Sequence, residues 1–168
     1  IERKPVMEKL REKDIEVLYF LDERDEFVTG MIHTYAEKQF QSVSNGDLDL
    51  ESEEEKKERE EKAEANKDML TAIKEDLGDK VSEVRISSRL GENDPVWLSA
   101  AEGVSMEMEK YMANDPLSNG HGPKASKILE INASHPIFNK LQSVYSENPE
   151  LLKDYAEVLF NQAMLIQG

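Results

Sequence analysis

The sequence EVRISSRLGENDPVWLS, residues 83–99, decides the fold class of this chain. Two sets of side chains alternate over its first half: Val84, Ile86, Ser88 and Leu90 alternate with Glu83, Arg85, Ser87 and Arg89. A period of two is typical of a β-strand with one buried face. Residues 95–99 follow the turn-forming stretch 91–94, so they are expected to form the antiparallel neighbour of this strand.

Further elements are expected towards the C-terminus. A short helix over 105–114, a loop over 115–126 rich in Gly, Pro, Ser and Asn, and a strand over 128–131 follow in order. Two helices open at Pro136 and Pro149, because proline suits the first turn of a helix. The second has a wide apolar face, which suits either packing inside the chain or half of a symmetric bundle with a second chain. That face consists of Leu151, Leu152, Tyr155, Val158, Leu159, Ala163, Leu165 and Ile166.

The plainest change in composition lies at residues 51–62, where every residue except Ser52 is charged. Ser52 and Glu55 have the spacing of a capping box, so a helix is expected to begin here. Its first turns have no apolar side chain to pack, whereas residues 63–77 supply an apolar stripe that ends near Gly78. We interpret this segment as a solvated linker helix that joins two units.

The domain boundary is placed at this linker, between residues 1–48 and residues 49–168. The first unit has the pattern of the end of an α/β unit. Its expected elements are a helix over 5–13 that carries Val6, Met7 and Leu10, a buried strand over 15–20, a helix capped by Asp22 with an apolar stripe of Phe27, Val28, Met31, Ile32 and Tyr35, a weak strand over 39–43, and a turn over 44–47. The whole chain is therefore expected to be mixed α/β (α+β): an αβα unit, a linker helix, and a small three-stranded sheet with helices.

Composition narrows the classes of function. The chain has 168 residues, 21 basic and 36 acidic, and its net charge of −15 argues against nucleic acid as a partner. It contains no cysteine, which excludes disulfides, thiolate metal sites and a cysteine nucleophile. No apolar run approaches the roughly 20 residues that a membrane span needs, and there is no signal peptide. Because the sequence begins at Ile1 rather than at a methionine, we expect an internal piece of a larger cytoplasmic protein.

No catalytic or cofactor-binding pattern is found. The three histidines, His33, His121 and His135, are scattered without zinc-type spacing, so surface or capping roles are expected. Residues 120–126 (GHGPKAS) resemble a phosphate loop only faintly, because the lysine does not follow a glycine and no strand closely precedes the loop. The carboxylates fall in solvated runs where nothing would raise a pKa. We therefore expect no enzyme activity, no metal and no cofactor in this chain itself.

A methionine-rich helix over 105–112 is the most informative feature. Met108, Tyr111 and Met112 share one face with Val104, while Met106 and Lys110 point elsewhere. Rows of flexible, polarisable methionines are typical of surfaces that accept many apolar shapes. Two interpretations stay open at this point: the face is part of the core, or it is an interaction surface.

Several stretches resemble a known family. Residues 15–20 (IEVLYF) followed by 22–27 (DERDEF) and 40–43 (FQSV) are similar to the end of the middle domain of the 90-kDa heat-shock protein chaperones of the bacterial HtpG type. Residues 84–90 (VRISSRL), 129–136 (LEINASHP) and 159–163 (LFNQA) resemble the C-terminal dimerisation domain of that family. The resemblance covers nearly the whole chain, with the motifs in the family's order and spacing.

The resemblance implies a function for the chain. The family is an ATP-driven clamp whose nucleotide-binding domain and catalytic-loop arginine lie outside these residues, so ATP and magnesium are implied only for the parent protein. Unfolded or non-native client proteins are the implied partners, together with a second copy of the chain and the other domains of the same protein. Matched by position, the client-binding residues would be Phe27, Val104, Met108, Tyr111 and Met112. The dimer interface would comprise Leu152, Tyr155, Leu159, Ala163 and Ile166, completing a C-terminal helical bundle.

The sequence also departs from the family pattern. Ala133 stands where a proline is common, and we expect the family's final helix, which completes the four-helix dimer interface, to be either absent or unresolved after residue 167. The eukaryotic tail that recruits helical-repeat co-chaperones is absent too, so that partnership is not implied. The alternative function that we keep open is a non-catalytic assembly or adaptor module whose methionine-rich helix is buried as core.

Overall fold

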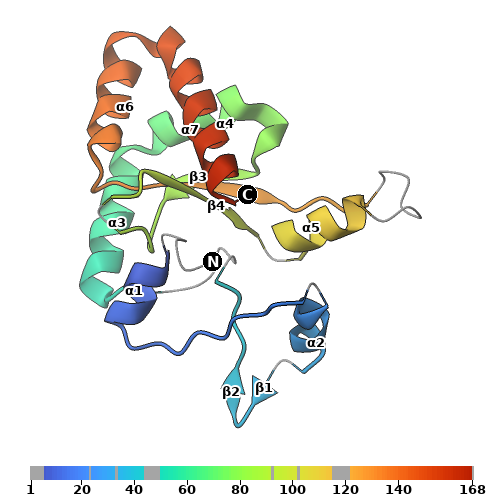
Figure 1. Ribbon diagram of the computed structural model, residues 1–168. Coiled ribbons are helices and arrows are strands. Elements are labelled where there is room, and N and C mark those ends of the chain that lie inside the picture. The colour runs from blue at the N-terminus through green and yellow to red at the C-terminus, as the bar shows by residue number, and fades with distance from the viewer. Residues whose placement is uncertain are drawn as a thin grey trace.

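A three-stranded sheet lies at the centre of the computed structural model, which describes residues 6–22, 24–32, 34–43, 50–91, 93–101, 103–114 and 122–167. Its strands are β3 (Glu83–Ile86), β4 (Val96–Ala100) and β5 (Lys127–Ile131). Their order is β3-β5-β4, so β5 is the middle strand (Figure 1). It runs parallel to β3 and antiparallel to β4. The expected mixed α/β fold is confirmed.

The expected pairing between residues 83–90 and 95–99 is wrong. β3 and β4 do not touch as neighbours, because β5 lies between them and pairs with both. Residues 87–95 connect the two strands, and a connection of this length exceeds the two to five residues or so of a tight hairpin. The alternation of polar and apolar residues therefore identified both strands without specifying which strand lies between them.

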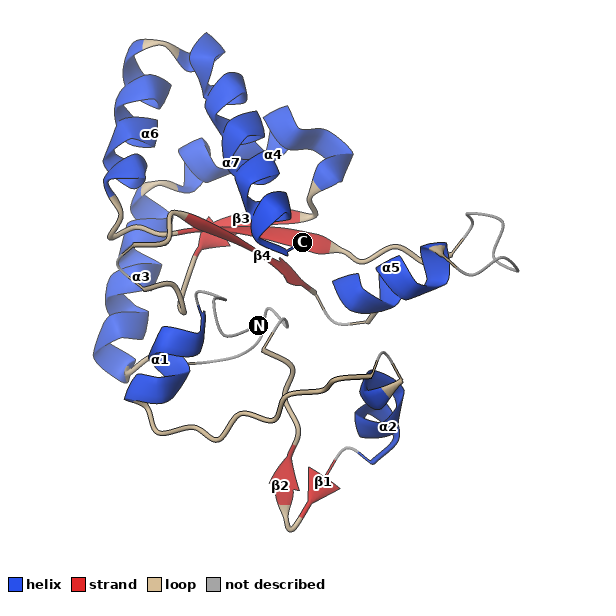
Figure 2. Cartoon of the chain, viewed as in Figure 1, coloured by secondary structure: helices blue, strands red, loops and turns tan. Residues whose placement is uncertain are grey.

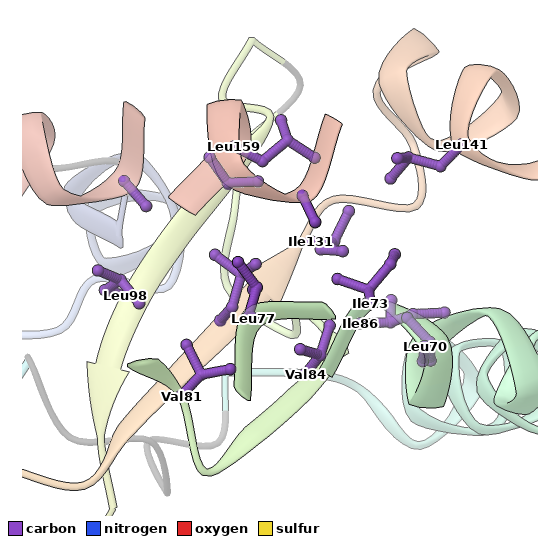
Figure 3. Packing of buried hydrophobic residues seen from close by; sticks show 14 of the residues in the cluster. Leu70, Ile73, Leu77, Val81, Val84, Ile86, Leu98, Ile131, Leu141 and Leu159 are labelled. Carbon is purple, nitrogen blue, oxygen red and sulfur yellow. The ribbon is translucent and has the colours of Figure 1, made fainter. Parts of the chain in front are cut away.

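Three helices cover one face of the sheet: α4 (Lys67–Leu77), α6 (Pro136–Glu147) and α7 (Leu152–Gln167). Leu159 of α7, Leu141 of α6 and Ile73 of α4 converge on the apolar side of the strands (Figure 3). Burial of this apolar surface is the main stabilising term of the domain. A 3₁₀ turn, Pro149–Leu151, precedes α7, so proline opens both C-terminal helices as expected. Within the described ranges, no helix has the length and apolar character needed to cross a bilayer.

The acidic linker forms α3 (Glu53–Ala65), which contains no buried residue. The expected capping box is present: Glu55 N donates to Ser52 Oγ at 3.2 Å, and Ser52 N donates to Glu55 Oε2 at 2.7 Å. Instead of running on to Leu77, the helix is interrupted at Asn66, which has φ −118° and separates α3 from α4. The Asn66 amide donates to Lys62 O at 2.7 Å and accepts from Gln142 at 2.7 Å, so side-chain bonds hold this break. The 3₁₀ turn η1 (Gly78–Lys80) ends α4.

The N-terminal unit contains α1 (Val6–Glu12), α2 (Asp25–Ile32) and a hairpin of two short strands, β1 (Thr34–Tyr35) and β2 (Lys38–Gln39). Its residues Val6, Met7 and Leu10 form a small second core together with Leu50, which lies just after residue 48. In Figure 2, α1 lies on the opposite side of the sheet from α6 and α7. The domain boundary between residues 48 and 49 stays a prediction.

Two predicted elements of this unit are wrong. Residues 15–20 are not a buried strand but irregular, mostly exposed chain, and Leu18 is 57% exposed. A buried strand needs neighbouring strands for its backbone hydrogen bonds, and the described residues place none beside it. The strand expected over 39–43 is confined to β2, and Tyr35 belongs to β1 rather than to the helix. His33, His121, the turn 44–47 and residues 115–121 of the loop lie outside the described residues.

Candidate interaction surface

The methionine-rich segment forms α5 (Met106–Ala113), with Ser105 at its N-terminus accepting a hydrogen bond from Met108 N at 2.9 Å. Met106 is 5% exposed and belongs to the main core, which fits its expected position off the shared face. Met108 and Met112 are only half-buried, and Tyr111 is 40% exposed. The helix therefore uses one methionine to attach to the core and presents the others at the surface.

Glu109 anchors α5 to the start of β5. Its Oε2 accepts from Lys127 Nζ at 2.8 Å and from the backbone N–H of Ala125 at 3.0 Å. Burial tends to raise the pKa of Glu109, but the hydrogen bonds from Lys127 and Ala125 outweigh it and hold the pKa below its ordinary value. The carboxylate is thus kept ionised, and its two hydrogen bonds hold α5 against the start of β5.

Phe27 of α2 contacts Tyr111 of α5. Their ring centroids lie 5.9 Å apart and the ring planes meet at 71°, an edge-to-face arrangement. Phe27 is 40% exposed, like Tyr111, so both rings keep a face towards solvent. The start of α2 is fixed by Asp25, whose Oδ2 accepts from the backbone N–H groups of Leu21 and Asp22 at 3.2 Å each. Residues predicted for one surface, although distant in sequence, are therefore brought together.

The structure adds apolar residues beside this contact. Val28, Met31 and Ile32 of α2 are 50%, 83% and 52% exposed. The sequence predicted them as part of the apolar stripe of this helix, and helical spacing reveals a shared face but not what covers it. We define the α2/α5 surface as the predicted client-binding residues together with the three exposed residues of α2. Its members are Phe27, Val28, Met31, Ile32, Val104, Met108, Tyr111 and Met112. Exposed apolar patches of this kind are characteristic of interaction sites.

The residues predicted for the dimer interface share one face of α7, and this face packs largely on the core of the same chain. Leu152, Leu159 and Ala163 are buried in the main core of this chain, whereas Tyr155 and Ile166 are partly exposed. The outward side of α7 instead carries Val158 and Leu165, which are 64% and 82% exposed. The wide apolar face read from the sequence therefore divides into a core side and a solvent side. The dimer interface itself stays a prediction.

A hollow of about 370 Å³ borders the same helix, between α7 and the start of α6. It is lined by Asn93, Pro95, His135, Ile137, Tyr155, Val158, Leu159 and Gln162.

Nδ1 of His135 accepts from Ile137 N at 3.2 Å, so this histidine caps α6, which is one of the roles expected for it. Among the residues that the structure describes, no cluster of His, Asp or Glu has a geometry suited to a metal ion.

Known proteins resemble this chain over its full length. The family model described as Hsp90 protein matches residues 1–168. Proteins named Chaperone protein HtpG are 45% identical in Clostridium perfringens and Clostridium acetobutylicum and 44% identical in Alkaliphilus metalliredigens, in each case over 100% of this chain and 26% of the relative. The chain thus spans about a quarter of the length of these relatives. On this match, the chain belongs to the Hsp90 family.

Proposed function

We propose that this chain is the part of an ATP-dependent molecular chaperone that binds unfolded or non-native proteins and joins two copies of the chaperone. The observation that carries the client-binding role is the α2/α5 surface, where Phe27 and Tyr111 meet edge to face and both remain 40% exposed. The relatives are named chaperones, which agrees with a surface of this chemistry.

The chemistry of the α2/α5 surface suits loosely held apolar segments. Methionine adapts its shape at little cost, and aromatic rings offer large contact areas with few rotatable bonds. Unfolded chains expose apolar side chains in varied orders, so an adaptable surface serves them better than a shaped pocket. The net charge of −15 favours solubility and so limits non-specific aggregation through this patch.

Dimerisation is proposed to use the C-terminal helices. The exposed side chains of Val158 and Leu165 on α7 leave apolar area outside the core, as a helix that packs against another helix needs. ATP and magnesium would bind elsewhere in the longer protein, together with the catalytic machinery. We place the protein in the cytoplasm, in line with its family.

Titration of a fluorescently labelled unfolded polypeptide with this chain tests the client-binding role. The variant Met108→Ser/Tyr111→Ser is expected to lose binding, while its circular dichroism stays unchanged because neither side chain is in the core. Leu18→Ser, which removes a 57% exposed apolar residue outside both α7 and the α2/α5 surface, is the matched control and should bind like the unaltered chain. Equal binding by all three proteins would overturn the assignment.

The adaptor alternative makes a different prediction for the same helix. A methionine-rich core would require Met108 and Met112 to be buried, yet only Met106 of this helix is. This distribution favours the surface role. Under the adaptor hypothesis the double serine variant would unfold, so its folded state separates the two functions.

A further inference from the structure

The face of the sheet opposite α4, α6 and α7 is built around one carboxylate. Glu130, in the middle strand β5, is fully buried. Its oxygens accept from Arg85 Nη2 at 2.9 Å, from Ser99 Oγ at 2.7 Å and from Ser87 Oγ at 3.0 Å. Arg89 adds a two-pronged contact, with Nη2 2.9 Å from Oε1 and Nε 3.1 Å from Oε2. The carboxylate is therefore bound by donors from β3, from β4 and from the segment after β3.

Arg89 also reaches beyond the sheet. It is fully buried, and the nitrogen that Glu130 leaves free, Nη1, donates to the backbone carbonyl of Val43 at 3.2 Å. Val43 follows the β1–β2 hairpin and packs on the small core of the N-terminal unit. One guanidinium thus holds the central carboxylate with one edge and the N-terminal unit with its remaining nitrogen.

A second hydrogen bond joins the two units, this time with its donor in the N-terminal unit. Lys9 of α1 donates from Nζ to the backbone carbonyl of Ser88 at 2.8 Å, next to Arg89 in the chain. The same Nζ lies 3.7 Å from Glu55 Oε1 at the start of α3. A cation from each unit therefore donates to a carbonyl of the other, and α1 lies beside α3 in Figure 1.

The geometry points to a docking latch: the buried Arg89–Glu130 pair, with Lys9, fixes the N-terminal unit on the sheet and so sets the position of α2 against α5. Undocking Val43 breaks a hydrogen bond from the charged guanidinium to a backbone carbonyl, so the docked arrangement is favoured. Partial undocking is penalised in the same way, which favours one defined arrangement over a range of orientations. The latch is a geometric claim; only its consequence for client binding rests on the proposed function.

Distances between spin labels test the latch directly. The sequence has no cysteine, so Lys38→Cys on β2 and Lys140→Cys on α6 place labels at two exposed positions without background. The unaltered pair is expected to give one narrow distance distribution. Arg89→Met/Glu130→Gln removes the pair without leaving a fully buried charge, since Arg85 is partly exposed, and the distribution should become broad or bimodal. Ser99→Ala, which removes only a β4 bond to the same carboxylate, should leave it narrow.

An unchanged narrow distribution in a folded Arg89→Met/Glu130→Gln variant would overturn the latch. If that variant fails to fold, Lys9→Met decides instead, because Lys9 is partly exposed and lies outside the carboxylate cluster. Broadening is again expected, and an unchanged width would reject the proposal. A broadened distribution with unchanged binding of an unfolded polypeptide would keep the latch and count against the α2/α5 surface, so the two claims fail separately.

Discussion

Arg89 Nη2 lies 2.9 Å from Glu130 Oε1, and neither side chain is exposed to solvent. A buried pair of this kind contributes little net stability compared with apolar residues, because both charges lose their hydration. Its role is specificity, since either partner alone is an uncompensated buried charge. The pair therefore makes the arrangement of strands and the docked N-terminal unit depend on each other.

Removing one member of the pair should be costly. Arg89→Ala is expected to lower the free energy of unfolding by about 3–5 kcal/mol, because Glu130 then loses its fully buried guanidinium. Urea denaturation followed by circular dichroism measures this change. The free energy of unfolding should fall far less in the neutral Arg89→Met/Glu130→Gln variant. An equal decrease in both variants would show that the uncompensated charge is not the cause.

Acid should weaken the fold through Glu130. Burial alone would raise the pKa of this carboxyl, but Arg89, Arg85 and the Ser99 hydroxyl hold it below its ordinary value. A carboxyl with a lower pKa in the folded state stabilises the fold above its unfolded pKa. That contribution is lost as the pH falls through the folded pKa. The stability difference between the unaltered chain and Glu130→Gln should shrink towards acid pH, whereas a constant difference would reject this role.

The two sides of α7 should respond differently to truncation. Leu159 is 3% exposed and packs in the core, so Leu159→Ala should cost about 2–5 kcal/mol of unfolding free energy. Leu165 is 82% exposed, so Leu165→Ala should change stability by no more than about 0.5 kcal/mol. Thermal unfolding of the two variants makes the comparison, and similar losses would place Leu165 in the core as well.

Association of two copies should depend on the exposed side of α7. Val158→Asp/Leu165→Asp is expected to shift any dimer towards monomer in sedimentation velocity without unfolding the chain, since both side chains are solvent-facing. Leu159→Asp is unsuitable here, because a buried charge would unfold the core. A dimer fraction unchanged by the double variant at equal concentration would exclude this side of α7 as the interface.

Much of the fold could be predicted from local patterns. The capping box at Ser52, the helix after Ser105 and the strand over 128–131 all depend on short-range chemistry, and all are present. The order of the strands could not be predicted, because alternation specifies a face but not a neighbour. The hydrogen-bond network around the buried Glu130 could not be predicted for a related reason. Its donors come from four separate positions along the chain, and only the fold brings them to one carboxylate.

The candidate surface was predicted only in part. Spacing within one helix was enough to separate Met106 from Met108, Tyr111 and Met112. The contact between Phe27 and Tyr111 depends on how α2 is placed against α5, which no local pattern encodes. The apolar stripe with Met31 and Ile32 was predicted, but its exposure was not, because amphipathic spacing is the same for a covered face and for an open one.

Site-specific photo-crosslinking detects contact between the α2/α5 surface and an unfolded polypeptide at single residues. A benzophenone amino acid replaces Tyr111 in one protein and the exposed Lys140 of α6 in another, and each is irradiated with a labelled unfolded polypeptide. If this surface binds clients, we expect strong crosslinking from position 111, little from position 140, and loss of the signal when excess unlabelled polypeptide competes. Equal crosslinking from both positions, or none from position 111, would contradict this expectation.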